Sequence, residues 1–469
     1  MRYTASVSLG CDTVKEAAVR GVSLRAASGR DHNRHMARAL TYAEAVAALT
    51  GALRFGTNPS LDKIRALCEL LGHPERACRW VQVTGTNGKT SVTRMTAAVL
   101  SAHGVRTAAY TSPHLAEYRE RIEVGGEPVS EADFARAVSA ALDADAALDG
   151  EPATEFELLT AAGLWLMRDL GVEWGVLEVG MGGRWDATSV VEPQVAVITG
   201  VALDHMRHLG GTVEEIAEDK AQIIKPGSLA VLGPGTDAAD AVLAARAGEV
   251  GAPIVRVRED GGLVAWDVVA VPDRPGGPTR LDVLSPLAGY TGIELTAPSY
   301  QAPNAGVALA ACEAALGRAL DRGAVRAAFA SLRFPGRFEL LRESPQLVID
   351  GAHNPEAALV LAVAIAEAWP DPQRRPAVLL GVLDDKDAEG IVRALAPVVT
   401  AFVCTRSASS RALPSADLAA VVERVTGTPP KADDDLRAAL ALAEDIGGGA
   451  GVVATGSLTV AGEVRALFC

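Results

Sequence analysis

The sequence predicts an α/β protein with a larger first domain built on a mostly parallel sheet and a smaller Rossmann-like α/β domain after it. Short apolar runs alternate with helical patterns from about residue 81, and polar loops follow directly after several of these runs. The alternation restarts beyond residues 334–338, a segment containing proline and glycine that we expect to act as a hinge. A chain of 469 residues is also longer than one hydrophobic core usually supports.

Apolar periodicity places the individual elements. In the first domain, strands are predicted at 81–84, 106–110, 175–179, 195–199 and 229–232, and helices at 89–103, 131–142, 157–170, 212–224 and 303–317. Thr212 and Glu215 have the spacing of a capping box, which supports a helix start there. Residues 253–300 are rich in turns and are predicted to form an antiparallel appendage. In the second domain, strands are predicted at 347–350, 377–382, 400–404 and 451–455, with helices at 355–368, 388–395 and 415–425.

A glycine-rich loop, TGTNGKTS at residues 84–91, follows the first predicted strand. Gly85 and Gly88 allow backbone N–H groups to approach phosphate oxygens, and the helix that follows adds partial positive charge. Lys89 supplies a cation, and Thr90 stands where a hydroxyl reaches nucleotide-bound Mg²⁺. Position 83 is valine where the common G-x-x-x-x-G-K-[ST] pattern has glycine, so the loop is a variant, and an ordinary glycine-rich turn is the alternative. The first domain is therefore predicted to be a P-loop ATPase.

Polar side chains follow three other predicted strands. Ser112, Glu178 and His205 each come at or just after the end of one of them. The carboxyl ends of parallel strands meet at one edge of a sheet, so these side chains are expected to converge beside the phosphate loop as ligands of a divalent ion. Taken singly, each has a structural alternative: Ser112 as a turn or cap residue, Glu178 as a solvated strand end and His205 as a helix-entry histidine.

Composition excludes several classes of protein. A net charge of −14 argues against extended nucleic-acid binding, which needs a basic surface. No apolar run approaches the roughly 18 residues of a membrane span, and the first 40 residues, an irregular N-terminal extension, support neither a secretory signal nor a transit peptide. Met36 is an alternative start. The six cysteines lie far apart without C-x-x-C pairs, which indicates reduced thiols and a cytoplasmic protein.

Ordered blocks along residues 41–469 resemble the folylpolyglutamate synthase and dihydrofolate synthase family, relatives of the peptidoglycan Mur ligases. The blocks that carry this resemblance are TGTNGKTS, YTSPHLAEYRERI (110–122), TEFELLTAAGLW (154–165), LEVGMGGRWDATSVV (177–191), LDHMRHLGGTVEEIAEDKAQIIKPG (203–227), FPGRFE (334–339), DGAHNP (350–355), DDKD (384–387) and TGSLTVAGEVRAL (455–467). The resemblance implies a Mur ligase-type ATP-binding domain over 41–334 and a glutamate ligase domain over 335–469. It also implies an ATP-dependent ligase that adds L-glutamate to dihydropteroate, to a folate or to both through an acyl phosphate.

The same resemblance implies roles for individual residues. The ATP-binding set is Gly85, Thr86, Asn87, Gly88, Lys89, Thr90, Ser91, Asn304, Arg337, Asp350 and His353; the magnesium ligands are Ser112, Glu178, His205 and an N-carboxylated Lys220; the pterin pocket is lined by Thr154, Phe156 and Asp186. Two Mg²⁺ ions are expected, and Lys89, Lys220, His205 and Arg337 are the expected catalytic residues. Without the resemblance, simpler interpretations remain open: a helical lysine paired with an acid for Lys220, a cap for Asn304, an ion pair for Arg337, a turn residue for His353 and core packing for Phe156.

Departures from the family pattern concern the acceptor rather than ATP. The family usually has Asn at Ser189, a Thr-Asp or similar pair at Met206-Arg207, and a smaller aliphatic residue at Trp185. These changes leave the preferred pterin substrate open. A Mur-type ligase with another carboxylate acceptor is the alternative function, disfavoured by the short N-terminal region. Small molecules are the only expected partners, and the chain is expected to be a monomer.

Overall fold

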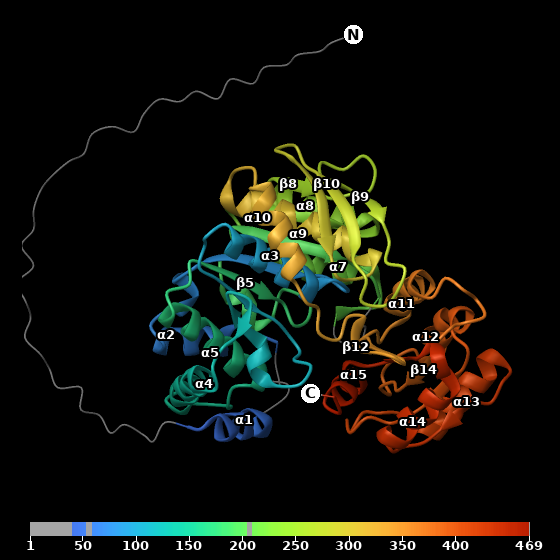
Figure 1. Ribbon diagram of the computed structural model, residues 1–469. Helices are drawn as coiled ribbons and strands as arrows, with labels where there is room; N and C mark the ends of the chain where they lie inside the picture. Colours follow the sequence, from blue (N-terminus) through green and yellow to red (C-terminus); the bar gives the residue numbers. More distant parts are fainter. Residues whose placement is uncertain (1–39, 53–58, 204–208, 469) are drawn as a thin grey trace, which may run out of the picture. The chain divides into compact units, whose positions relative to one another are not determined.

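The computed structural model describes residues 40–52, 59–203 and 209–468. The predicted irregular extension before residue 40 and the predicted ligand His205 lie outside these residues. Figure 1 shows the described helices and strands in the order of the chain. Two large sheets and one small sheet carry the fold. None of the described helices is long and apolar enough to cross a membrane.

The first sheet has eight strands in the order β4-β3-β2-β5-β1-β6-β7-β8. Their bounds are β1 Arg79–Thr84, β2 Thr107–Tyr110, β3 Ile122–Val124, β4 Glu127–Pro128, β5 Trp174–Glu178, β6 Val195–Gly200, β7 Leu229–Gly235 and β8 Ile254–Arg256. Six neighbouring strands, β2, β5, β1, β6, β7 and β8, pair in parallel. The β3–β4 hairpin pairs in antiparallel fashion at the β2 edge. The mostly parallel sheet that the sequence predicts is therefore present.

Helices cover both faces of this sheet, because alternate strand residues point to opposite sides and both sides are apolar. In β6, Val195 and Val197 belong to one core and Ala196 and Ile198 to another. The first core includes residues of α3 Lys89–Ala102, α9 Ala302–Leu316 and α10 Arg322–Ser331. Helices on the other side are α1 Tyr42–Gly51, α2 Asp62–Leu70, α4 Glu131–Ala146, α5 Glu155–Asp169, α7 Val213–Lys220 and α8 Asp240–Val250.

One part of the sequence interpretation needs correction in this domain. Residues 253–300 were expected to form only an antiparallel appendage, yet β8 lies within them and pairs in parallel with β7. The rest of the segment does form an antiparallel sheet, ordered β11-β10-β9, from β9 Ala265–Ala270, β10 Thr279–Leu284 and β11 Gly289–Leu295. A three-residue strand is too short to show a pattern, so its pairing is set by tertiary structure.

The third sheet has the order β12-β13-β17-β14-β15-β16 and forms the smaller α/β unit. Its strands are β12 Glu339–Glu343, β13 Gln346–Ile349, β14 Ala377–Leu380, β15 Phe402–Cys404, β16 Lys431–Ala432 and β17 Val452–Thr455, of which only β12 is antiparallel. One face packs against α11 Pro355–Ala368, α12 Ala388–Leu395 and α13 Ser415–Thr426, and the other against α14 Leu436–Gly447 and α15 Leu458–Arg465.

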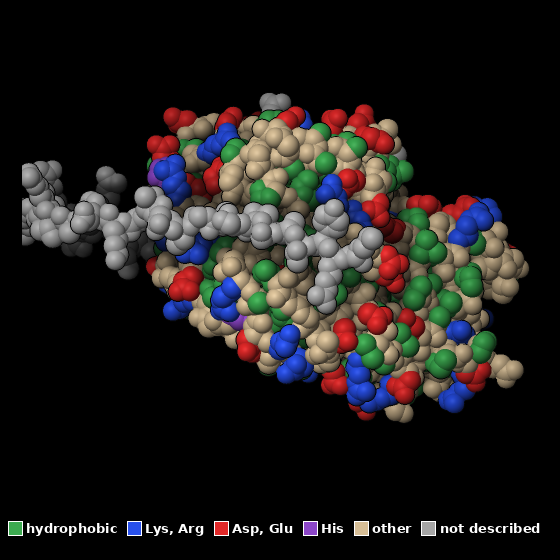
Figure 2. Space-filling view, turned by 90° about the horizontal axis from the view of Figure 1, so that it is seen from above, with side chains coloured by type: hydrophobic (Ala, Val, Ile, Leu, Met, Phe, Trp, Pro, Cys, Tyr) green, Lys and Arg blue, Asp and Glu red, His purple; other side chains and the backbone are tan. Residues whose placement is uncertain are grey.

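Charged side chains of both signs are interspersed on the face of the molecule seen in Figure 2. The described side chains visible in this view form no continuous basic area, in keeping with the excess of acidic residues in the sequence. The cysteines of the described residues, namely Cys68, Cys78, Cys312 and Cys404, are free thiols.

Candidate active site

The phosphate loop joins β1 to α3, and its backbone requires glycine at two positions. Gly88 has φ +85° and Gly85 has φ +152°, values that residues with a side chain rarely adopt. A Cβ at Gly85 would lie 1.9 Å from Thr199 Oγ1, and one at Gly88 would lie 2.6 Å from Asn304 Oδ1. The loop backbone at Gly85 and Gly88 therefore lies close to Thr199 and Asn304. The first N–H groups of α3 have no partner within the helix, so they are available for an anion.

Contacts from β6 and from within the loop fix its shape. The Thr199 hydroxyl donates to the carbonyls of Thr84 and Asn87. Thr86 Oγ1 donates to Ala202 O (3.2 Å) and accepts from Ala202 N (2.9 Å). Lys89 Nζ donates to Gly85 O at 2.9 Å and to Thr86 O at 3.1 Å. The ammonium group therefore lies across the mouth of the loop.

Glu178 brings three strand-end segments together. Its Oε1 accepts from the Thr90 hydroxyl at 2.9 Å, and its Oε2 accepts from Ser112 N at 3.1 Å. The side chain is only 1 % exposed. Burial raises the pKa of the Glu178 carboxyl, whereas Lys89, Thr90, Ser112 and Arg337 lower it, with Lys89 the largest of these. Two of the three predicted strand-end ligands thus meet beside the loop, and the third lies outside the described residues.

The oxygen atoms at this point fit a hard divalent cation. The carboxylate of Glu178 and the hydroxyl of Thr90 are the kind of donors Mg²⁺ prefers when nucleotide phosphates and water complete its shell, and Ser112 contacts Glu178 through its backbone N–H. Within residues 40–52, 59–203 and 209–468, no group of three His, Cys, Asp or Glu side chains is placed to hold a metal without such help.

Lys220 lies on the other side of the loop, at the last residue of α7. It is 4 % exposed, and its Nζ donates to Gly85 O at 3.0 Å, the same carbonyl that Lys89 contacts. A small cavity of about 10 Å³ separates the loop from residues 180–182, and Lys220 and Lys89 both line it. Two lysines thus converge on one carbonyl of the phosphate loop.

The segment after β5, residues 179–191, is held by one of its own carboxylates, Asp186, and by one from α7, Asp219. Asp186 Oδ2 accepts from Gly180 N at 2.9 Å and from Met181 N at 3.1 Å, and Oδ1 accepts from the backbone and hydroxyl of Thr188. Asp219 Oδ1 accepts from Gly183 N and Arg184 N. Both oxygens of Asp186 are thus engaged within the loop, and this tight turn could not be anticipated from its sequence.

The other two residues predicted for the pterin pocket lie at the start of α5. Thr154 is the N-cap and forms a capping box with Glu157. A Cβ on Gly180 would lie 2.9 Å from the Phe156 ring, so Phe156 packs directly on the loop that Asp186 closes. Its ring also lies 6.3 Å from that of Tyr110. Phe156 and Asp186 are therefore neighbours across Gly180.

The predicted nucleotide contacts beyond the loop are divided between α9 and the second α/β unit. Asn304 donates to Gln301 Oε1 at 2.7 Å and faces Gly88. Arg337 Nη1 donates to Gly336 O, and this guanidinium lowers the pKa of Asp350, which burial raises. Asp350 accepts from the backbone N–H groups of Phe338 and Ala352, both at 2.8 Å. His353 Nδ1 lies 2.9 Å from Gly351 O.

Three further residues belong to this site that are not among those predicted from the sequence. Thr199 closes the loop from β6, Gln301 bridges Ser91 to Asn304, and Glu356 Oε2 accepts from Asn87 Nδ2 at 2.6 Å. Thr199 ends a predicted strand, and Gln301 is three residues before Asn304 on the same helical turn. The strand end and the three-residue spacing are the features of the sequence that could have identified Thr199 and Gln301. Nothing in the sequence links Glu356 to Asn87.

Two protein-family models match this chain. The model of the Mur ligase middle domain matches residues 83–250, and that of the Mur ligase glutamate ligase domain matches residues 336–458. The dihydrofolate synthase/folylpolyglutamate synthase of Mycobacterium tuberculosis is 38% identical over 450 residues, covering 88% of this chain and 90% of that protein.

Solved structures give the same result. Folylpolyglutamate synthase of M. tuberculosis, complexed with ADP and AMPPCP, superposes with a TM-score of 0.82 at 38% identity, covering 87% of this chain and 95% of that one. Escherichia coli FolC in complex with DHPP and ADP gives 0.80 at 28% identity, covering 92% and 98%. The bifunctional folylpolyglutamate synthase/dihydrofolate synthase of Yersinia pestis, with AMPPNP and a Mn ion, gives 0.79 at 28%, covering 91% and 98%. The chain belongs to the folylpolyglutamate synthase/dihydrofolate synthase family of Mur-type, ATP-dependent carbon–nitrogen ligases.

Proposed function

We propose that this chain joins L-glutamate to dihydropteroate, to a reduced folate or to both, and that it activates the acceptor as an acyl phosphate. The observation that carries the proposal is the meeting of Thr90, Ser112 and Glu178 at the phosphate loop. That arrangement supports phosphoryl transfer from ATP, and the family supplies the acceptor class.

The chemistry follows from the low reactivity of a carboxylate toward amines. An oxygen of the acceptor carboxylate attacks the γ-phosphorus of ATP, and ADP leaves. The uncharged α-amine of glutamate then attacks the acyl carbon, a proton is lost from nitrogen, and phosphate departs as the amide forms. The protein needs no covalent nucleophile, so its residues act by orientation and by charge stabilisation.

Lys89, Glu178 and Arg337 are the residues to which we assign this stabilisation. Lys89 would exchange its contacts with Gly85 O and Thr86 O for the phosphoryl oxygens of bound ATP. Mg²⁺, bound through Glu178, Ser112 and Thr90, would supply further positive charge on those oxygens. Arg337 influences both Glu178 and Asp350 electrostatically, so it can contribute as the second α/β unit approaches the nucleotide. We assign Asn304, Asp350 and His353 to nucleotide binding.

Lys220 is proposed to act after carboxylation by CO₂. Its amine would form an N–C bond with CO₂ and release a proton, which converts a cation into an anionic oxygen ligand. Its burial beside Lys89 and the loop supports this role, because an anion there is suited to a second divalent ion. His205 is proposed as a further ligand on the resemblance alone.

The pterin ring is proposed to bind near Thr154, Phe156 and Asp186. The ring of Phe156 offers a stacking surface next to Gly180. Because both Asp186 oxygens already accept hydrogen bonds in the loop, Asp186 would shape the pocket and share its remaining lone pairs with the ligand.

We also propose domain limits at residues 41–334 and 335–469, and a monomer working in the cytoplasm. The start of the separate third sheet at β12 supports the domain limits, and the free thiols of the described cysteines support the compartment.

The experiment is a parallel assay. Purified protein is given Mg-ATP and glutamate with either dihydropteroate or tetrahydrofolate, and the products are weighed by mass spectrometry. Addition of one glutamate residue to at least one acceptor is expected. ATP hydrolysis without glutamate addition to either acceptor would refute the proposal.

A further inference from the structure

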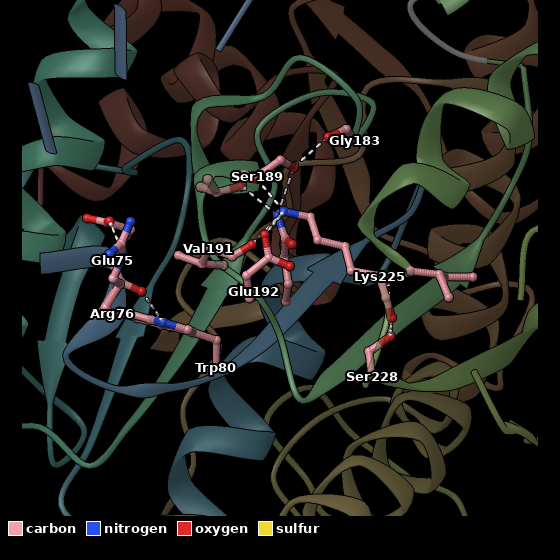
Figure 3. A network of polar contacts seen from close by, with 12 residues as sticks. Glu75, Arg76, Trp80, Gly183, Ser189, Val191, Glu192, Lys225 and Ser228 are labelled. Atoms are coloured by element: carbon pink, nitrogen blue, oxygen red, sulfur yellow. Dashed lines mark hydrogen bonds and ion pairs between the residues drawn. The ribbon is translucent and has the colours of Figure 1, made fainter. Parts of the chain in front are cut away.

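Lys225 binds carbonyl groups at the far end of the segment that carries Asp186. Its Nζ donates to Ser189 O at 2.7 Å and to Val191 O at 2.6 Å, and it pairs with Glu192 Oε1 at 3.4 Å. Figure 3 shows the amine between these groups. The side chain is 17% exposed. Burial lowers the pKa of the amine and Glu192 raises it in part, and the two carbonyls and the carboxylate are its partners where hydration is limited.

The two carbonyls are acceptors that the local backbone leaves open. The short 3₁₀ helix η3, Ala187–Val190, ends at this point, and terminal carbonyls of a helix have no partner within it. The backbone of Lys225 is itself fixed, because Ser228 Oγ donates to Lys225 O at 2.8 Å and accepts from Lys225 N at 3.2 Å. Lys225 therefore acts as a rigid anchor rather than a loose surface cation.

A continuous chain of hydrogen bonds runs from this anchor toward the proposed pterin pocket. The Ser189 hydroxyl donates to Gly183 O, and Gln82 Nε2 donates to Ser189 Oγ at 3.0 Å and to Thr188 Oγ1 at 3.2 Å. Thr188 in turn donates to Asp186, which holds the N–H groups of Gly180 and Met181. All of these side chains are buried. The anchor and the surface of Gly180 that contacts Phe156 are thus parts of one network.

We propose that Lys225 is a positioning residue for the acceptor: by fixing the carbonyls of Ser189 and Val191 it sets the shape of residues 180–191, and through them the folate-binding side of the active site. In this proposal Lys225 contacts neither ATP nor the folate acceptor. Its effect passes through Ser189, Thr188 and Asp186. The inference rests on the proposed function, because that function assigns the folate pocket to this loop. The phosphate loop is held mainly by Thr199 and Thr86, and Thr84 Oγ1 joins it to residues 180–191 by donating to Gly182 O at 2.6 Å. ATP binding should therefore depend on Lys225 much less than acceptor binding does.

The test compares steady-state kinetics of the wild type with Lys225→Met, which keeps the length of the side chain and removes the charge. We expect KM for the folate acceptor to rise by about tenfold or more, as for the loss of a charge-assisted hydrogen bond, with KM for ATP changed by less than about twofold. Lys225→Arg keeps the cation and should recover part of the acceptor affinity. The matched control is Lys63→Met, since Lys63 is another poorly exposed lysine (21%) and pairs with Asp145 on α4 rather than with residues 180–191.

Ser189→Ala keeps the Lys225 contacts and removes only the hydroxyl bridge, so it tests the network if Lys225→Met does not fold. It should raise the acceptor KM without changing the ATP KM. An unchanged acceptor KM in Lys225→Met, or in Ser189→Ala if that variant alone folds, would overturn the inference. So would equal rises for both substrates together with a lower melting temperature, because that result indicates general damage. An inactive wild type would instead count against the proposed function.

Discussion

Replacing Lys89 with alanine should stop catalysis while leaving the protein folded. In the structure the ammonium group donates to two backbone carbonyls, Gly85 O at 2.9 Å and Thr86 O at 3.1 Å. The side chain lies at the loop surface, partly exposed, and does not belong to either core of the sheet. Lys220 Nζ still donates to Gly85 O in the variant, so the main loss is the charge-assisted hydrogen bond to Thr86 O, which costs about 1.5 to 3 kcal/mol of stability. The expected fall in melting temperature is therefore no more than about 5 °C.

The catalytic cost is expected to be larger than the structural one. Removing one donor that stabilises developing charge lowers kcat by roughly 10² to 10³, or about 3 to 4 kcal/mol in the transition state. Lys89 also adds a full charge rather than a dipole, so this range is a lower bound. The assay measures glutamylated product by mass spectrometry, with circular dichroism melting on the same sample.

Lys431→Ala is the control, because Lys431 is an exposed lysine on β16. It should keep full activity and the wild-type melting temperature. Product formation by Lys89→Ala at the wild-type rate would refute the role of the lysine. A loss of activity matched by loss of folded protein would refute the argument that the site and the core are independent here.

Three further predictions follow from single side chains. Lys220→Ala should be inactive, with partial recovery by added short carboxylates that replace the missing oxygen ligand; full activity without additives would reject carboxylation. Burial and the neighbouring Arg121 lower the pKa of His114 from 6.5 to about 4, so the unfolded chain binds the proton more readily and stability falls as the pH drops through this window. Denaturant unfolding measured from pH 6.5 to 4 should show that the wild type loses up to about 3 kcal/mol in its free energy of unfolding, a loss that His114→Gln lacks. The same pH dependence of stability in both proteins would contradict this. Gly175→Ala places a Cβ 2.1 Å from the Trp80 ring and should destabilise the protein by about 1 to 3 kcal/mol in urea unfolding; an unchanged midpoint would show that the ring moves freely.

Elements with strong local signals could be predicted from the sequence. The helices at 355–368 and 388–395 match α11 and α12 at both ends. Asn354 and Asp387, both good N-cap residues, precede them, and Pro355 favours the first turn. By contrast, β8 has three residues and α8, α10 and α14 were not predicted, because short or weakly marked segments depend on what packs against them.

The candidate site was predictable to the extent that it follows strand ends. Parallel strands bring Ser112 and Glu178 to one edge of the sheet, and the structure places them in contact. Contacts between side chains of separate elements could not be predicted in this way. No sequence pattern shows that Lys220 reaches the carbonyl that Lys89 also contacts, or that Asp186 directs its oxygens back into its own loop. Those contacts depend on how separate elements pack.

The central claim is that the acceptor carboxylate is phosphorylated by ATP at the phosphate loop before glutamate attacks. Oxygen transfer measures this directly. The acceptor is labelled with ¹⁸O in its reacting carboxylate and is turned over with Mg-ATP and glutamate, and the inorganic phosphate released is analysed by mass spectrometry. An acyl phosphate predicts one ¹⁸O atom in each phosphate formed. Phosphate that carries no label, released while glutamylated product accumulates, would contradict the account.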